Sequence, residues 1–258
     1  MKLRRNLHFR KQRGFTLLEM LLSLLIMVIV IGAVFSQMDT AQKRMNAEQT
    51  KLDDFQQARD FVDQFFRDIN QIGDPNIRLF DQAAIVPAFQ SPLAPPYQSP
   101  RFNDNRVAVG LVRVDTTSIA FEGSVNGIGT VQSVQYMING SGTCALCLQR
   151  SQVDKANNVS PWQQGTNWGT EINDVVSNPI FSYFDVSGNL IGGLPVDIST
   201  PAGAQTIANI KTIQISMRIQ NPAVVDMQTG QPIESVFEGK VSLNNCSMAT
   251  TGQPMSCQ

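Results

Sequence analysis

The sequence predicts an α+β fold in which a long N-terminal helix, first transmembrane and then amphipathic, packs on a C-terminal antiparallel β-sheet domain. Two observations lead to this prediction. An almost uncharged run, Phe15–Phe35, precedes a stretch with apolar residues at three- and four-residue steps, and the C-terminal half alternates apolar and polar residues between Gly, Asn and Ser turns. Helices and strands do not alternate as in parallel βαβ folds, so we expect an antiparallel sheet.

Composition and charge bound the function. A chain of 258 residues with 42% hydrophobic content suits one globular core with an appended helix. Six of the 20 Lys and Arg residues lie in residues 1–14, which leaves 14 basic against 21 acidic residues, a formal charge of −7, after Gly14. Nucleic-acid binding requires clustered Lys and Arg, so we do not expect nucleic acid as a partner.

The same segment holds the only histidine, His8, so the rest of the chain has no imidazole base or metal ligand. Motifs of the form GxSxG or HExxH and a phosphate-binding glycine loop are absent from the sequence. We therefore expect a protein that is not an enzyme, with no cofactor and no metal.

The apolar run Phe15–Phe35 would extend about 31 Å as a helix, close to the roughly 30 Å of a bilayer's hydrocarbon core. In a secretory signal the small residue follows the apolar run, whereas here Gly14 precedes it. The positive-inside rule keeps residues 1–14 in the cytoplasm and sends the C-terminal part across the membrane. We expect a single-pass protein with a cytoplasmic N-terminus.

Glu19 is the only charged residue of this run. A carboxylate near the middle of a membrane helix costs about 2.5–3.5 kcal/mol, so such a charge usually has a partner. Taken alone, Glu19 leaves two interpretations open. It is either an interfacial carboxylate that reaches the headgroups, or a functional charge with a partner in the membrane.

The string RKQRGFTLLEM, residues 10–20, resembles the processing site of type IV prepilins and type II secretion pseudopilins. The resemblance implies that a prepilin peptidase cuts after Gly14 and methylates Phe15, and that Glu19 is the acidic residue required at the fifth mature position. It further implies that the Phe15 ammonium pairs with Glu19 of a neighbouring subunit in an apolar filament core. Ser36 stands where many major pilins carry a helix-bending proline.

The chain divides into segments by composition. The amphipathic stretch ends at Gly73, because Pro75 disfavours helix in the residue before it. Six prolines then mark an irregular connection. The expected segments are a basic leader peptide 1–14, a transmembrane helix half 15–36, an amphipathic helix half 37–73, a Pro-rich connecting loop 74–105 and a β-rich globular domain 106–258.

Strands are expected where short alternating runs are bounded by turn residues. The sequence DMQTG, residues 226–230, is typical of a hairpin tip between the last two long strands. The expected strands are 106–114, 117–122, 131–139, 145–150, 180–186 with Leu190 after an SGN turn, 206–220 and 235–243.

The motifs FRDINQIGD, SIAFEG, YFDVSGNLIG and FEGKVSLNN occur in an order that resembles W-type minor pilins and J-type pseudopilins. This resemblance implies a minor subunit that primes or caps a type IV pilus or a type II secretion pseudopilus. Its implied partners are other minor and major pilins or pseudopilins, the prepilin peptidase and the inner-membrane assembly platform. The implied location is the bacterial inner membrane, with the C-terminal domain periplasmic or extracellular, and then the filament.

Two other functions stay open. One is an adhesion or ligand-binding module at a filament tip, for which Trp162 and Trp168 in the polar segment SPWQQGTNWG are candidate anchors. The same two residues could instead cap the edge of the sheet. The other is a signal-anchored periplasmic protein unrelated to filaments, in which replacing Gly14 or Glu19 would be harmless.

Four cysteines, Cys144, Cys147, Cys246 and Cys257, lie in the part expected outside the cytoplasm, which favours two disulfides. The C-x-x-C pair lacks the helix N-terminus of a redox dithiol. A zinc site would need a second close pair, whereas ten residues separate Cys246 from Cys257. Three connectivities are available, of which we favour the local pairs Cys144–Cys147 and Cys246–Cys257, the second resembling the C-terminal loop staple of pilins.

Overall fold

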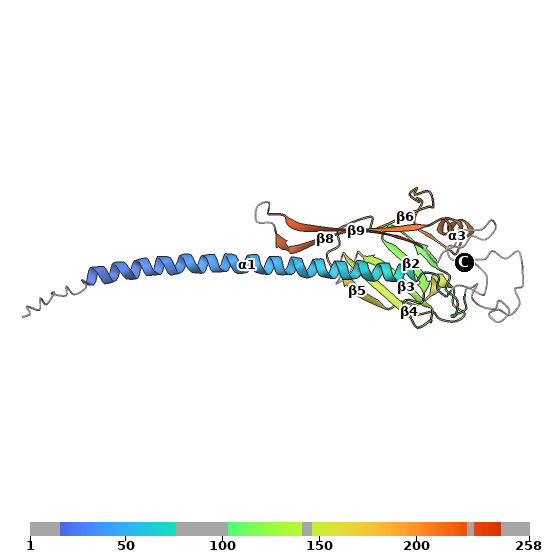
Figure 1. Cartoon of the computed structure of the whole chain (residues 1–258), viewed down its shortest axis with the longest axis horizontal. Coiled ribbons are helices and arrows are strands. Elements are labelled where there is room, and N and C mark those ends of the chain that lie inside the picture. The colour runs from blue at the N-terminus through green and yellow to red at the C-terminus, as the bar shows by residue number, and fades with distance from the viewer. Residues whose placement is uncertain (1–15, 76–102, 141–145, 226–229, 244–258) are drawn as a thin grey trace, which may run out of the picture. The chain divides into compact units, whose positions relative to one another are not determined.

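The computed structural model describes residues 16–75, 103–140, 146–225 and 230–243. Its internal contacts divide the chain into two units, Met1–Thr50 and Lys51–Gln258, which are described separately. Helix α1, Leu17–Asn70, supplies the described part of the first unit and the first element of the second (Figure 1).

In the first unit, the large apolar side chains of α1 are exposed from Leu17 to Met45. Among the described residues, α1 is the one helix long and apolar enough to cross a membrane by length and composition. The helix ends at Asn70, three residues before the predicted end. Gly73 then adopts a positive φ of 75°, which the missing side chain permits.

The second unit contains two sheets. The larger sheet has the strand order β5-β4-β3-β2-β1-β7, and the smaller has the order β6-β8-β9. All pairs of named strands are antiparallel, which confirms the predicted α+β class. The elements after α1 are β1 Leu111–Val114, β2 Ser118–Gly123, β3 Gln132–Asn139, β4 Cys147–Asp154, the 3-10 helix η5 Pro161–Gln163, β5 Trp168–Ile172, β6 Phe181–Phe184, β7 Val196–Asp197, α3 Pro201–Ala208, β8 Thr212–Val225 and β9 Pro232–Ser242.

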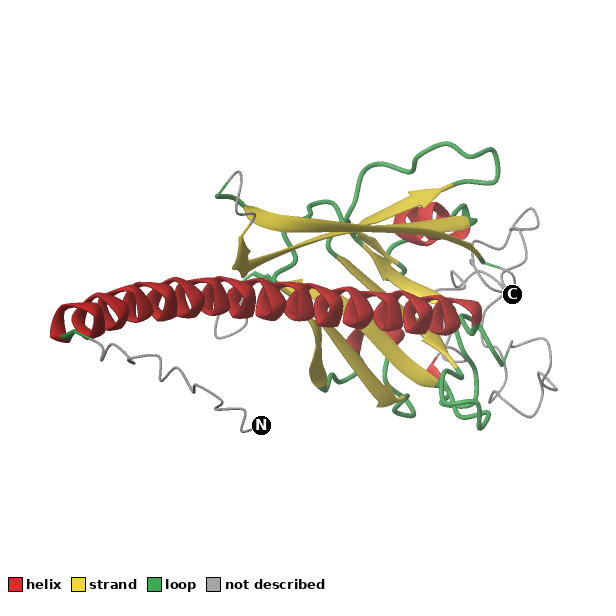
Figure 2. Ribbon diagram, turned by 60° about the vertical axis from the view of Figure 1, so that its left-hand side comes forward, coloured by secondary structure: helices red, strands yellow, loops and turns green. Residues whose placement is uncertain are grey.

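The C-terminal part of α1 forms the centre of the core, with the strands of the two sheets on either side of it (Figure 2). The Phe65 ring lies 5.4 Å from the ring of Tyr136 in β3 and 5.6 Å from that of Phe181 in β6, measured between centroids. One helical side chain therefore joins both sheets. Phe61 and Ile69, one turn away on either side, extend the same buried stripe.

Two predicted strands begin several residues before the observed ones. The run 106–114 begins to pair only at Leu111, because buried side chains bond the backbone groups of Val107 and Val109. Residues 206–208, predicted as strand, lie in α3. There the Thr200 hydroxyl accepts a hydrogen bond from the Gly203 N–H, and Pro201 occupies the first turn, so local capping overrides the β-branched pattern.

Strands β5 and β7 were not predicted, because their short sequences show little alternation. The predicted hairpin tip, residues 226–230, lies outside the described residues except for Gly230. This glycine has a φ of 67°, a value typical of a turn glycine.

Candidate functional site

The N-terminal end of α1 is closed by reciprocal hydrogen bonds between Thr16 and Glu19. The Thr16 backbone N–H and hydroxyl donate to Glu19 Oε2 at 3.0 Å and 3.1 Å, and the Glu19 N–H donates to Thr16 Oγ1 at 3.4 Å. This is a capping box, which satisfies donors that a helix start otherwise leaves unpaired. Glu19 thus has a partner within its own chain.

A capping role for Glu19 was missed at the sequence level, although the T-x-x-E pattern that signals it is visible in FTLLEM. A negative charge in the first turn is also favoured by the helix dipole. Cleavage after Gly14 would leave both members of the capping box in the mature chain. Gly14 and Phe15 themselves lie outside the described residues.

Near the other end of α1, Asp68 fastens the helix to the larger sheet. Its Oδ2 accepts hydrogen bonds from the Tyr136 hydroxyl at 2.6 Å and from Arg150 Nε and Nη2 at 2.9 Å and 2.7 Å. Asp68 is buried and the Arg150 side chain is nearly so. Burial, together with the Asp68 carboxylate, raises the pKa of Tyr136 well above its ordinary value.

A second buried ion pair joins Glu122 of β2 to Lys155, which follows β4. The Lys155 Nζ lies 2.6 Å from Glu122 Oε2, and neither side chain is exposed. Lys155 also donates to the Val107 carbonyl at 2.8 Å, and the Val109 N–H donates to Glu122 Oε2 at 3.1 Å. The pair therefore fixes the segment before β1 through hydrogen bonds to the backbone of that segment.

The burial of this pair shifts both groups toward their neutral forms. Burial raises the pKa of Glu122, which the Lys155 ammonium opposes, and burial lowers the pKa of Lys155, which the Glu122 carboxylate opposes. Glu122 Oε1 is buried and has no hydrogen-bond partner among the described residues. The pair is thus tightly coupled and only partly satisfied.

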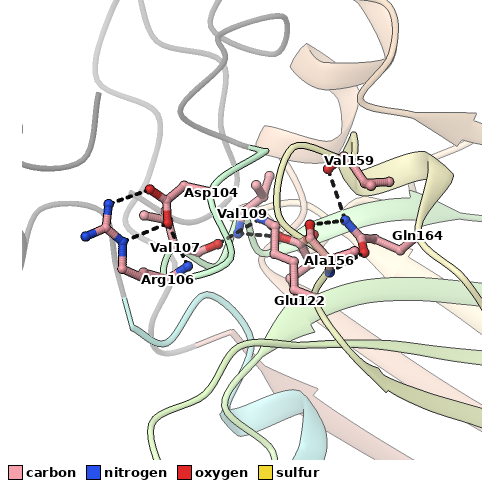
Figure 3. Close-up of polar contacts among 9 residues, drawn as sticks. Asp104, Arg106, Val107, Val109, Glu122, Ala156, Val159 and Gln164 are labelled. Carbon is pink, nitrogen blue, oxygen red and sulfur yellow. Dashed lines mark hydrogen bonds and ion pairs between the residues drawn. The ribbon is translucent and has the colours of Figure 1, made fainter. Parts of the chain in front are cut away.

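Polar contacts beside the pair organise the adjoining loops (Figure 3). Asp104 binds Arg106 with Oδ2 2.7 Å from Nη2, and this contact lowers the pKa of Asp104. The Gln164 amide accepts a hydrogen bond from the Ala156 N–H at 2.8 Å and donates to the Val159 carbonyl at 3.0 Å. These contacts pair polar groups of the loops with one another and create no nucleophile or base poised for chemistry.

The comparison with known proteins identifies the N-terminal segment. Residues 9–35 match the family model of the prokaryotic N-terminal methylation motif. This segment is therefore similar to prokaryotic methylation motifs. It contains Gly14, Phe15 and the capped Glu19, and together with an apolar helix long enough to cross a membrane it supports a type IV prepilin-like protein. No curated protein and no solved structure matches the chain.

Two polar clefts lie beside the C-terminal part of α1, away from the methylation motif. One, of about 420 Å³, is lined by acidic groups including Asp53, Asp60 and Glu171, and burial raises the pKa of Glu171. The other, of about 440 Å³, presents Arg67 and Arg150. The described part of the chain contains no group of three or more His, Cys, Asp or Glu side chains that could hold a metal ion.

Three of the remaining candidate residues, Cys147, Trp162 and Trp168, lie within the described part of the chain. Cys147, the first residue of β4, takes part in a disulfide bond. Cys144, Cys246 and Cys257 lie outside the described residues, so the connectivity stays a prediction. Trp162 is half-buried and packs against the core from η5, and Trp168 is half-buried at the start of the edge strand β5.

Proposed function

We propose that this chain is a minor pilin or pseudopilin, a structural subunit that primes or caps assembly of a type IV pilus or a type II secretion pseudopilus. The observation that carries the proposal is the methylation motif at residues 9–35, with Glu19 at the start of a helix that continues to Asn70. The two-sheet domain built on the end of that helix gives the subunit a large globular body.

The proposed processing step is cleavage after Gly14 by a prepilin peptidase, followed by methylation of the new N-terminus at Phe15. The capping box supports a defined role for Glu19 in the assembled filament. Because Thr16 holds Oε2 at the first turn, the carboxylate is kept at the N-terminal end of the helix. An ammonium at Phe15 of a neighbouring subunit could then pair with Oε1, which has no hydrogen-bond partner among the described residues, in apolar surroundings.

Processing is tested by the intact mass and N-terminal sequence of the membrane-extracted protein, expressed with and without a prepilin peptidase. We expect a peptidase-dependent chain that starts at methylated Phe15. A chain that stays uncut with an active peptidase, or that is cut after the apolar run, would remove the main support for a filament role.

Assembly is tested separately with Glu19→Ala. The variant should be cleaved as the parent is, because Glu19 lies beyond the scissile bond, but its incorporation into filaments should fall strongly. Glu48→Ala is the matched control, since Glu48 is an exposed acidic residue of the same helix. Normal incorporation of Glu19→Ala, measured against the Glu48 control by quantitative immunoblotting of sheared filaments, would refute the proposed role of Glu19.

A further inference from the structure

Strand β9 is a long edge strand that pairs on one side only. In the order β6-β8-β9, the described residues place β8 beside it and no strand on its other side. The other edge of β8 forms backbone hydrogen bonds along its length, first with β6 and then with the segment that precedes β6. There the Val176 N–H donates to the Arg218 carbonyl, and the Ser216 N–H donates to the Ile180 carbonyl, each at 2.8 Å.

The register shows which backbone groups of β9 face the open side. The Ser216 N–H and the Arg218 carbonyl point away from β9, so the odd-numbered residues of β8 point toward it. Met217 lies opposite Phe237 and Ile215 opposite Gly239, so the odd-numbered residues of β9 bond β8. The N–H and carbonyl groups of the even-numbered residues 234–240 are therefore directed at the open edge.

The side chains along this edge are incompletely covered. The inward-facing residues of β8 are buried, whereas those of β9, such as Phe237 and Val241, are only half-buried. Phe55 of α1 packs on Phe237 with ring centroids 5.1 Å apart and is still 51% exposed. On the outer face, Val236 is 57% exposed. These incompletely covered apolar side chains therefore form a rim along the same edge that carries the unpaired backbone groups.

Natural edge strands are usually protected by prolines, bulges or charges that repel another strand. Here the pairing with β8 has no bulge between Thr212↔Ser242 and Gln220↔Glu234. The charges of β9 turn toward their own sheet. Glu234 pairs with Arg218, and the Lys240 Nζ lies 4.2 Å from the centroid of the Phe184 ring.

Glu238 is the exception among these charges. Its Oε1 accepts a hydrogen bond from the Ser216 hydroxyl at 3.3 Å, and it has no cationic partner among the described residues. Its backbone groups are among those directed at the open edge. A strand placed beside β9 would carry a side chain directly across from Glu238, where opposite charges attract.

We propose that the open edge of β9 receives an extended strand from a partner subunit, with apolar residues at alternate positions and a Lys or Arg across from Glu238. The unpaired backbone favours an extended partner, the half-covered rim at Phe55 and Phe237 favours apolar side chains, and Glu238 favours the cation. The assignment of the occupant to a filament subunit rests on the proposed function. Binding of such a strand depends on the domain alone.

The test uses the full chain in detergent micelles and a synthetic peptide, acetyl-TVKVTVKV-amide, with acetyl-TVEVTVEV-amide as the matched control. Residue-resolved hydrogen exchange reports the amides of β9. We expect the lysine peptide to slow exchange at Val236, Glu238 and Lys240 by about tenfold or more, and the glutamate peptide to have little effect. Amides of the odd-numbered residues 235–241 should be protected with or without peptide.

Two variants make the result specific. Val236→Pro removes an N–H that faces the open edge, which an edge strand tolerates, and should abolish the protection, whereas Val236→Thr should retain it. Glu238→Lys leaves the backbone intact and should transfer the preference to the glutamate peptide. This second variant keeps the test decisive if the proline variant does not fold.

Three outcomes would overturn the proposal. The first is equal protection by both peptides, and the second is protection by the lysine peptide that survives in Val236→Pro. The third is protection of the even-numbered amides in the absence of peptide. Protection that does not depend on protein concentration would show that another part of the chain covers the edge, and protection that increases with protein concentration would show that a second copy covers it. Each result is independent of peptidase processing and of the Glu19→Ala assay, so this inference and the proposed function can fail separately.

Discussion

Replacing Lys155 by Met should destabilise the second unit strongly and in a pH-dependent way. Methionine has nearly the shape of the lysine stem but carries no charge, so the variant leaves Glu122 buried without its cation. It also removes the hydrogen bond that Lys155 donates to the Val107 carbonyl. Both partners have no exposed side-chain surface, so water cannot replace the lost contacts.

The size of this destabilisation follows from the response of the variant that costs the least free energy, which is protonation of Glu122. Its ordinary pKa is 4.5, so protonation at pH 7 costs about 3.4 kcal/mol, and the unpaired Val107 carbonyl adds about 1 kcal/mol. We expect a loss of about 4 kcal/mol in the free energy of unfolding, or about 10 °C in Tm for a unit of this size.

The pH dependence has a definite sign. A buried carboxyl whose folded pKa is raised binds its proton more readily in the native state, so its native state gains relative stability as the pH falls. At pH 5 protonation of Glu122 costs about 0.7 kcal/mol, so the deficit of Lys155→Met relative to the parent should shrink by about 2.7 kcal/mol between pH 7 and pH 5.

Urea unfolding in detergent micelles, followed by tryptophan fluorescence, measures this deficit, because both tryptophans, Trp162 and Trp168, lie in the second unit. Lys51→Met, at an exposed position, is the control and should change stability by less than about 0.5 kcal/mol. Glu122→Leu combined with Lys155→Met removes both buried charges but leaves the Val107 carbonyl and the Val109 N–H unpaired, so it should recover about 2 of the lost ~4 kcal/mol. A deficit that is the same at both pH values, or a double variant as unstable as the single one, would refute the reasoning.

Two further predictions concern packing and alkaline pH. Gly239→Ala would place a Cβ 2.2 Å from Phe66 Cζ and should lower the free energy of unfolding, measured in urea, by about 1–3 kcal/mol. The control Gly192→Ala, whose Cβ would have no atom within 4 Å, should leave the free energy of unfolding unchanged. Equal effects of the two substitutions would contradict the contact between Gly239 and Phe66. Burial raises the pKa values of Tyr136 and Tyr183 well above about 10, so stability should hold up to pH ~10 and fall above it. Tyrosinate absorbance and circular dichroism should therefore change together, and ionisation of both residues in the folded protein would contradict this prediction.

The helix and most strands follow from local patterns that the sequence displays. The predicted strand 131–139 differs from β3, Gln132–Asn139, by one residue, because its alternation matches a sheet with one buried face. The methylation motif is equally local, since its residues are contiguous. Where the backbone departs from its pattern, as at 106–110, the cause is a pair of side chains from distant positions, which periodicity cannot reveal.

The buried ion pairs were out of reach for the same reason. Asp68 and Arg150 are 82 residues apart in sequence, and Glu122 and Lys155 are 33 apart. A partial signal existed for Asp68, which interrupts the apolar stripe formed by Phe65 and Ile69 and so needed a buried partner. The sequence carries no such signal for Glu122, because a glutamate in an alternating run is expected to face water.

The central position of α1 in its core determines the order in which this protein can mature. The helix is synthesised first, yet Phe65 contacts Phe181, and Phe66 fits against Gly239, which lies near the end of the described chain. If the second unit crosses a membrane with its N-terminal part first, as proposed, its aromatic stripe stays exposed until almost the whole sequence has been translocated. Shielding of that stripe, by a chaperone or by the membrane surface, would then be part of the maturation of this protein.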